Sequence, residues 1–247
     1  MTSATPEPTA PLALLDQVAA ATARLLETVE GMSDDDVITP SLLPGWTRGH
    51  VLAHTSRNAD SLVNLLLWAR IGVEIPQYAS KFIRDHDIEA GAARPIAEQL
   101  TDLATSAHRW QALARTTPDT AWSATVRTRA GREIPATEVP WMRLQEVEIH
   151  HVDLGLSYTP ADWPTDFRDR LLTAATADLD RAISAETPAT TPTFAIHTTD
   201  TDFTATLGRG TPTRTITAPT PTLLAWLIGR SPGTDLADTL PTLPAWR

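Results

Sequence analysis

Residues 143–154 read RLQEVEIHHVDL, and this stretch predicts a helix with an unusual concentration of polar side chains. Glu146 and His150 are four residues apart, so they lie one above the other on the same helical face. A carboxylate and an imidazole at this spacing form a suitable pair of metal ligands. The helix is expected to begin after a cap at Thr137 and to run to about Leu156. Polar residues on an inward face predict a site in the core of a helical bundle.

A second stretch, residues 43–60, reads LPGWTRGHVLAHTSRNAD and predicts another helix, which Thr47 caps and which runs to about Ile71. His50 and His54 have the same four-residue spacing. One histidine of this helix could complete a His/Glu/His set with the Glu–His pair of the first stretch. Three protein ligands with one open position describe a catalytic zinc site. Each pair is equally compatible with an ordinary helix-stabilising contact, so the spacing alone leaves both interpretations open.

Three further polar residues surround the Glu–His pair of the first stretch. Asp153 follows His150 by three residues and could accept a proton from its imidazole, as carboxylates behind metal-bound histidines do. Glu148 and His151 are rotated off the ligand face. We interpret them as residues that are exposed to solvent, support a ligand or lie at a helix interface.

The rest of the chain predicts an α+β protein. Helical periodicity up to about residue 158 predicts four helices and a small hairpin, and the later residues, rich in Thr and Pro, predict a small α+β domain. We therefore expect a four-helix bundle over residues 1–158 and a C-terminal domain over residues 159–247. The expected helices and strands are these: helices at 11–30, 47–71, 92–114, 137–156, 165–185 and 220–229, a hairpin at 121–134, and strands at 193–199, 202–208 and 214–218.

Composition excludes several classes of function. The net charge of −10 argues against nucleic acid as a partner, and the 247 residues contain no apolar run long enough to span a membrane. The absence of cysteine excludes a disulfide scaffold, a thiolate-ligated metal and a cysteine nucleophile. The segment Met1–Pro11 lacks the basic start of a signal peptide, so we expect a cytoplasmic protein.

Three stretches resemble the mycothiol-dependent maleylpyruvate isomerase family. Residues 43–60 resemble its metal-binding N-terminal part, residues 143–154 resemble its second signature, and residues 224–230, LAWLIGR, resemble its C-terminal motif. The resemblance implies a DinB-like four-helix bundle, followed by a small α+β domain that closes over the site. It also implies the metal ligands, which are His54, Glu146 and His150, and it leaves His50 outside the ligand set.

The resemblance further implies the chemistry. A divalent metal, with zinc as the first candidate, would activate the thiol of mycothiol, which would attack an electrophilic substrate. The expected reaction is the cis–trans isomerisation of a maleylpyruvate-type acid. Arg230 matches an arginine associated with activity and is expected to bind a substrate carboxylate. Its alternative role is that of a cation near the end of a helix, where it would interact with the helix dipole.

Three other functions stay open at this point. A mycothiol S-transferase would use the same metal and the same low-molecular-weight thiol to conjugate electrophiles. A metal-dependent hydrolase would use metal-bound water in place of the thiol. A non-enzymatic bundle would only bind a ligand or a partner.

Overall fold

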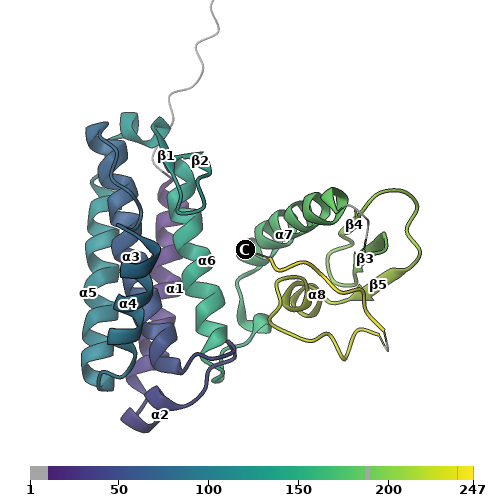
Figure 1. Ribbon diagram of the computed structural model, residues 1–247, viewed down its shortest axis with the longest axis horizontal. Coiled ribbons are helices and arrows are strands. Elements are labelled where there is room, and N and C mark those ends of the chain that lie inside the picture. Colours follow the sequence, from purple (N-terminus) through teal and green to yellow (C-terminus); the bar gives the residue numbers. More distant parts are fainter. Residues whose placement is uncertain (1–10, 187–189, 238, 247) are drawn as a thin grey trace, which may run out of the picture. The chain divides into compact units, whose positions relative to one another are not determined.

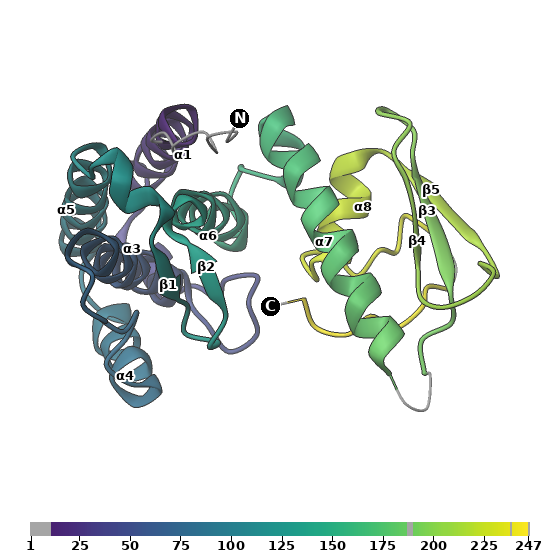
Figure 2. The same ribbon diagram turned by 90° about the horizontal axis from the view of Figure 1, so that it is seen from above.

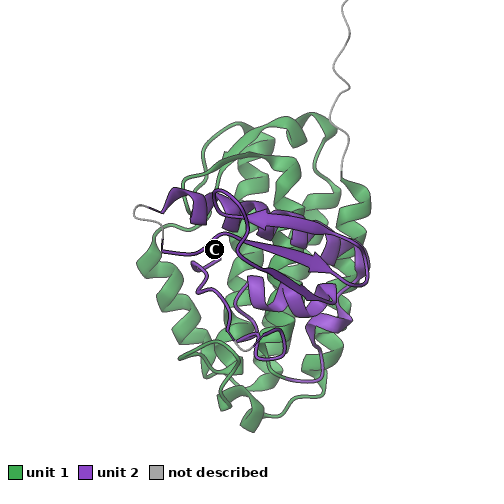
Figure 3. Ribbon diagram, turned by 90° about the vertical axis from the view of Figure 1, so that its right-hand side faces the viewer, with its two compact units in different colours: residues 1–155 green, residues 156–247 purple. Residues whose placement is uncertain are grey.

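The computed structural model describes residues 11–186, 190–237 and 239–246. The expectation about a signal peptide concerns Met1–Pro11, which lies almost entirely outside the described residues. The chain divides into two compact units, Met1–Gly155 and Leu156–Arg247 (Figure 3). The domain limits expected from the sequence, 1–158 and 159–247, stay a prediction. Among the helices of the described ranges, none combines the length and apolar character needed to cross a membrane.

Unit 1 is built on four long helices that lie side by side (Figures 1 and 2). They are α1 (Leu12–Glu30), α3 (Arg48–Ile71), α5 (Ile96–Arg115) and α6 (Val139–Asp153). Helix α3 packs against both α5 and α6, and α1 packs against the same two helices. Figure 2 looks along this bundle. The core residues that are at most 1% exposed include Leu15 and Leu25 of α1, Leu52, Leu62, Leu65 and Leu66 of α3, Trp110 of α5 and Leu144 of α6.

Shorter elements complete unit 1. They are α2 (Asp34–Ile38), α4 (Lys81–Ala92), the 3-10 turns η1 (Asp119–Ser123) and η2 (Ala136–Glu138), and the strands β1 (Thr125–Arg127) and β2 (Glu133–Pro135). The two strands pair antiparallel with Val126 opposite Ile134, so the predicted hairpin is confirmed. Helix α4, which packs on α3, falls in a segment where the sequence predicts no helix.

The ends of two predicted helices differ from the structure. Thr137 does not cap α6, because it lies inside the 3-10 turn η2, and α6 begins only at Val139. The same helix stops at Asp153 instead of Leu156, because Gly155 adopts a left-handed φ of +65° that breaks the helical path. Helix α5 begins at Ile96, after Pro95, and not at Ala92.

Unit 2 is a small α+β unit. It contains η3 (Pro160–Asp162), α7 (Thr165–Ala185), β3 (Phe194–Thr198), β4 (Thr204–Leu207), β5 (Thr215–Ala218) and α8 (Thr220–Leu227). The strand order is β4-β3-β5, with β4 antiparallel and β5 parallel to β3. Helices α7 and α8 lie beside each other next to the sheet (Figure 2), and Phe194 of β3 contacts Trp226 of α8 in the core. The predicted α+β class is therefore confirmed, with a helical bundle first and a small mixed unit after it.

Candidate metal centre

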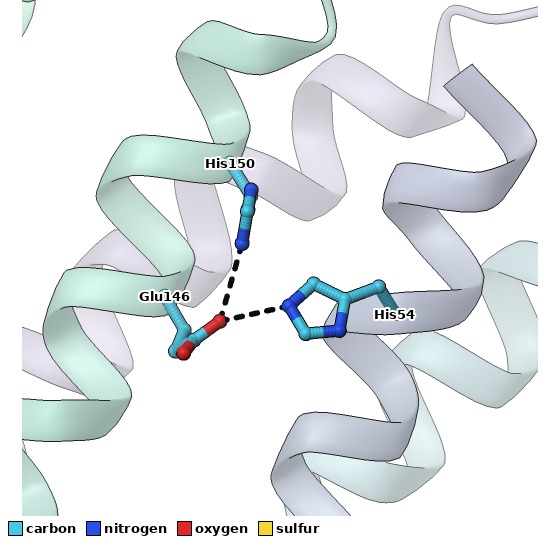
Figure 4. A group of neighbouring side chains, drawn as sticks. All are labelled: His54, Glu146 and His150. Carbon is cyan, nitrogen blue, oxygen red and sulfur yellow. Dashed lines mark hydrogen bonds and ion pairs between the residues drawn. The ribbon is translucent and has the colours of Figure 1, made fainter. Parts of the chain in front are cut away.

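Three side chains converge between α3 and α6 (Figure 4). His54 comes from α3, and Glu146 and His150 come from α6. Oε2 of Glu146 lies 3.0 Å from Nε2 of His54 and 3.2 Å from Nε2 of His150. One ligand atom from each residue lies within 4.8 Å of the other two. The structure thus brings together the three residues that the resemblance named, and together they could hold a metal ion.

The i,i+4 spacing on α6 places Glu146 and His150 on one face, and a buried arginine helps to set the distance to α3. Arg143 is fully buried and lies three residues before Glu146. Its Nη1 donates to the carbonyl oxygen of Thr55, 2.8 Å away, and to Oδ1 of Asn58, 3.0 Å away. Both acceptors belong to α3, so this guanidinium joins the two helices that carry the ligands. This role of Arg143 was not predicted from the sequence, because it depends on a contact between helices.

The ring of His150 has a carboxylate behind it. Nδ1 of His150 lies 2.8 Å from Oδ2 of Asp153, whose side chain is fully buried. This contact confirms the partner predicted from the sequence. Burial disfavours the charged imidazole, but the hydrogen bonds to Asp153 and Glu146 outweigh burial and raise the pKa of His150 to about 9. Asp153 therefore fixes the orientation of the ring and increases its basicity.

The other two residues of the cluster have pKa values that suit ligands at neutral pH. Burial favours the neutral form of Glu146, but hydrogen bonds from His150 and His54 hold its pKa well below the ordinary value. Burial lowers the pKa of His54, and the interaction with Glu146 only partly opposes this. The cluster therefore contains an ionised carboxylate beside an imidazole that is neutral at pH 7.

His50 lies outside the cluster, as the resemblance implied. Its Nδ1 accepts a hydrogen bond from the backbone N–H of Thr47 at 3.1 Å, and the Thr47 side chain accepts from the N–H of His50. The predicted N-cap at Thr47 is thus confirmed, and His50 completes it as a capping box. Nε2 of His50 lies 3.2 Å from Oε2 of Glu89 on α4. Neither ring nitrogen of His50 faces the candidate ligands.

Glu148 and His151 face α1, away from the cluster. Oε1 of Glu148 pairs with Nη2 of Arg24 at 2.6 Å, and Nε2 of His151 lies 2.8 Å from Oγ1 of Thr28. Both side chains are buried. Of the three roles that the sequence left open for them, the structure therefore supports the helix interface.

Two residues near His54 were not predicted as part of the site. The Trp46 ring lies edge-on to the His54 ring, with centroids 5.5 Å apart. Nη2 of Arg84, on α4, lies 3.4 Å from Nδ1 of His54. Trp46 stands in the stretch 43–60 and could have been noticed there. Arg84 carries no local signal, because only the packing of α4 on α3 brings it to the site.

Arg230 follows the end of α8 in unit 2. Its Nη1 donates to the carbonyl oxygen of Ile228 at 3.0 Å. This contact agrees with the alternative role at the end of a helix, while its expected catalytic role stays a prediction.

The donor set fits a divalent metal of the zinc type. Two imidazole nitrogens and one carboxylate oxygen, supplied here by two helices, are ligands that zinc takes in catalytic sites. His54 and His150 expose 7% and 12% of their side chains, while Glu146 exposes 31%, so the carboxylate side of the cluster is the accessible one. The fold and this cluster define a helical-bundle protein with a candidate His/Glu/His metal centre.

Comparison with known proteins agrees with that class. The family model of the mycothiol maleylpyruvate isomerase N-terminal domain matches residues 18–155. The chain belongs to this family. No curated protein matches the chain.

Solved structures extend the likeness beyond the matched domain. Two crystal structures of the mycothiol-dependent maleylpyruvate isomerase, one of them a histidine-to-alanine mutant, are each 27% identical to the chain. Each match covers 95% of this chain and 96% of the other, with a TM-score of 0.86. YfiT from Bacillus subtilis, described as a probable metal-dependent hydrolase with an unusual four-helix bundle topology, matches 58% of this chain and 82% of its own at 20% identity, with a TM-score of 0.47.

Proposed function

We propose that the protein is a metal- and mycothiol-dependent enzyme that isomerises a maleylpyruvate-type acid from cis to trans. One observation carries the proposal. His54, Glu146 and His150 converge within 4.8 Å in a chain that matches a mycothiol-dependent maleylpyruvate isomerase over 95% of its length. The family relation supports a small acid as the substrate and a low-molecular-weight thiol as the second reactant.

The metal and the thiol have separate roles in the proposed reaction. His54, Glu146 and His150 would hold the metal, with zinc as the first candidate. A divalent ion bound there would keep an external thiol in its thiolate form at neutral pH. The thiol must come from outside, because the chain contains no cysteine.

The chain's own residues prepare the centre. With a metal bound, Asp153 would accept from Nδ1–H of His150, 2.8 Å away, and would leave the lone pair of Nε2 facing the cluster. Glu146 stays ionised and supplies a negative charge that balances a divalent ion. Arg230 is proposed to bind a carboxylate of the acid through its planar fork.

The reaction itself needs no redox partner. The thiolate sulfur forms a bond to one carbon of the cis double bond, and the π electron pair moves onto the conjugated carbonyl oxygen of the acid as an enolate. The remaining carbon–carbon single bond rotates. The electron pair then returns, the double bond forms again in the trans geometry, and the carbon–sulfur bond breaks to release the thiolate unchanged. Each turnover therefore consumes no thiol.

The experiment compares zinc-loaded protein with and without mycothiol, using maleylpyruvate as substrate. The proposal predicts formation of the trans isomer only when the thiol is present. A parallel incubation contains the thiol and a bimane electrophile. If a thiol conjugate accumulates while maleylpyruvate stays cis, the protein is a transferase and not an isomerase. Turnover without any thiol would instead indicate a hydrolase or another metal-dependent reaction.

A further inference from the structure

The two histidines of the candidate centre have opposite partners behind their rings. Nδ1 of His150 faces the carboxylate of Asp153 at 2.8 Å. Nδ1 of His54 faces a cation, because its neighbour is Nη2 of Arg84 at 3.4 Å. Metal-bound histidines almost always donate their second ring N–H to a carboxylate, a carbonyl or water. His54 therefore departs from the usual arrangement, whereas His150 follows it.

The different neighbours of the two histidines matter because they restrict which ring nitrogen of His54 can carry its proton. A neutral imidazole carries a single N–H. In a metal-free centre Nε2 of His54 can donate to Glu146, and Nδ1 is then free to accept from Arg84. When Nε2 is occupied by a metal, the proton must sit on Nδ1. Nδ1–H and the guanidinium N–H of Arg84 are then two donors that face each other without an acceptor.

Besides Nη2, Arg84 has one donor without a partner. Its side chain is only 16% exposed, and Nη1 is occupied by Oδ1 of Asp85 at 2.7 Å. Nε is buried and has no hydrogen-bond partner within the described part of the chain. Nε and Nη2 form one edge of the guanidinium, the edge that binds a carboxylate with two parallel hydrogen bonds. Among the described residues, no carboxylate or carbonyl accepts from Nδ1 of His54.

Arg84 is also held in place by an aromatic ring. Its guanidinium carbon lies 5.8 Å from the centre of the Tyr78 ring, a cation–π distance. The segment that carries Tyr78 is anchored to α3, since Asn64 donates to the carbonyl oxygen of Gln77 at 3.3 Å and Gln77 donates to Ser61 at 3.3 Å. The guanidinium is therefore a preorganised group and not a freely moving surface side chain.

We propose that Arg84 and Nδ1–H of His54 together form a binding position for a carboxylate of the acid substrate, beside the metal centre. The inference rests on the proposed function for the identity of the ligand, and on the two facing donors for its place. A carboxylate oxygen there accepts from His54 and gives it the same type of partner that Asp153 gives His150. The second oxygen accepts from Arg84. The substrate acid thus completes the hydrogen bonding of a ligand histidine when it binds.

The test uses succinate, a saturated diacid to which a thiol cannot add. Isothermal titration calorimetry measures its affinity for the zinc-loaded full chain and for the variants Arg84→Gln and Arg84→Lys. The control is Lys81→Gln, which makes the same change in charge on the same helix at a side chain that is 82% exposed. Zinc content is measured for every variant, so that loss of metal is separated from loss of acid binding.

The inference predicts that Arg84→Gln weakens succinate binding about tenfold or more with zinc retained. Arg84→Lys should lie between this variant and the wild type, because lysine keeps the charge and loses the fork. Lys81→Gln should leave the affinity within about twofold, as expected for an exposed charge. Equal succinate affinity in the wild type and Arg84→Gln would overturn the inference, and so would the absence of succinate binding to the zinc-loaded wild type.

Failure of the proposed function has a different signature. If the wild type binds succinate through Arg84 but shows no thiol-dependent isomerisation, the proposed reaction is wrong and the carboxylate position stands. If isomerisation proceeds and KM is unchanged in Arg84→Gln, the carboxylate position is wrong and the proposed reaction stands.

Discussion

Nδ1 of His150 lies 2.8 Å from Oδ2 of Asp153, one turn further along α6. The Asp153 carboxylate is completely buried. The other ring nitrogen of His150, Nε2, lies 3.2 Å from Oε2 of Glu146, the oxygen that also contacts His54. The His150 imidazole thus lies between two carboxylates, one at each ring nitrogen. These two contacts determine both the orientation of the ring and its proton affinity.

The first prediction concerns the contact between Asp153 and His150. Asp153→Asn keeps the size of the side chain and removes its charge, so the His150 ring becomes less basic and less well oriented. Zinc affinity should fall about 10- to 100-fold. Competition with a chromophoric chelator measures the change. Asp169→Asn, an exposed position on α7, is the matched control and should leave zinc affinity unaltered. Equal affinities in the two variants would contradict the role of Asp153.

The raised pKa of His150 predicts a pH dependence. Metal-free His150, with a pKa of about 9, holds a proton at pH 7 that a metal must displace from Nε2. Glu146 is already ionised and His54 already neutral, so these two residues release no proton. Binding should therefore release about one proton per metal at pH 7, and affinity should rise about tenfold per pH unit up to about pH 9.

Calorimetric titrations of the metal in two buffers of different ionisation enthalpy count the released protons. The same titrations at pH 10 should show almost no release from His150. An affinity that stays constant between pH 7 and pH 9 would show that His150 does not carry the proton.

Gly49 lies in the first turn of α3, where a larger side chain is expected to destabilise the protein. A Cβ added there would overlap the carbonyl oxygen of Ala92 at the end of α4 and would lie 2.7 Å from Cγ1 of Val37. Because a backbone atom cannot move aside easily, Gly49→Ala should lower the free energy of unfolding by about 2 to 3 kcal/mol. Urea denaturation measures it. Gly31→Ala is the control, since its Cβ would make only an ordinary 3.5 Å contact. Similar stabilities for both variants would contradict this close packing.

Substitution of Arg230 tests whether unit 2 contributes a residue to catalysis. Arg230→Ala should reduce thiol-dependent turnover about a hundredfold, a typical cost of removing one positioned donor, while zinc content is unchanged. Arg181→Ala removes a side chain that is 73% exposed and should retain turnover. If Arg230→Ala turns over like the wild type, Arg230 serves only at the end of its helix.

Much of the candidate site could be predicted because its geometry is local. Two residues four positions apart on a helix share a face whatever the rest of the fold does, so Glu146 and His150 stand out in the sequence. The choice between His50 and His54 could not be made that way, because they too share a face. It depends on the capping box at Thr47, which occupies His50.

Arg84 could not be predicted at all. The sequence of α4, KFIRDHDIEAGA, has only three large apolar residues, and two of them, Phe82 and Ile83, are exposed, so it lacks the strong apolar face that would indicate a helix. Its contact with His54 arises only when α4 packs on α3. The predicted start of α6, after a cap at Thr137, is wrong for a related reason. Thr137 has the chemistry of an N-cap, but the chain places a 3-10 turn there before the helix begins.

If three side chains on two helices hold one metal ion together, metal analysis of purified variants will show it. We expect about one zinc ion per chain in the wild type and in His50→Ala, whose imidazole belongs to the helix cap. We expect almost none in His54→Ala, His150→Ala and Glu146→Gln, with circular dichroism to show that each variant is folded. One zinc ion per chain retained in these three variants would show that His54, Glu146 and His150 are not the metal ligands.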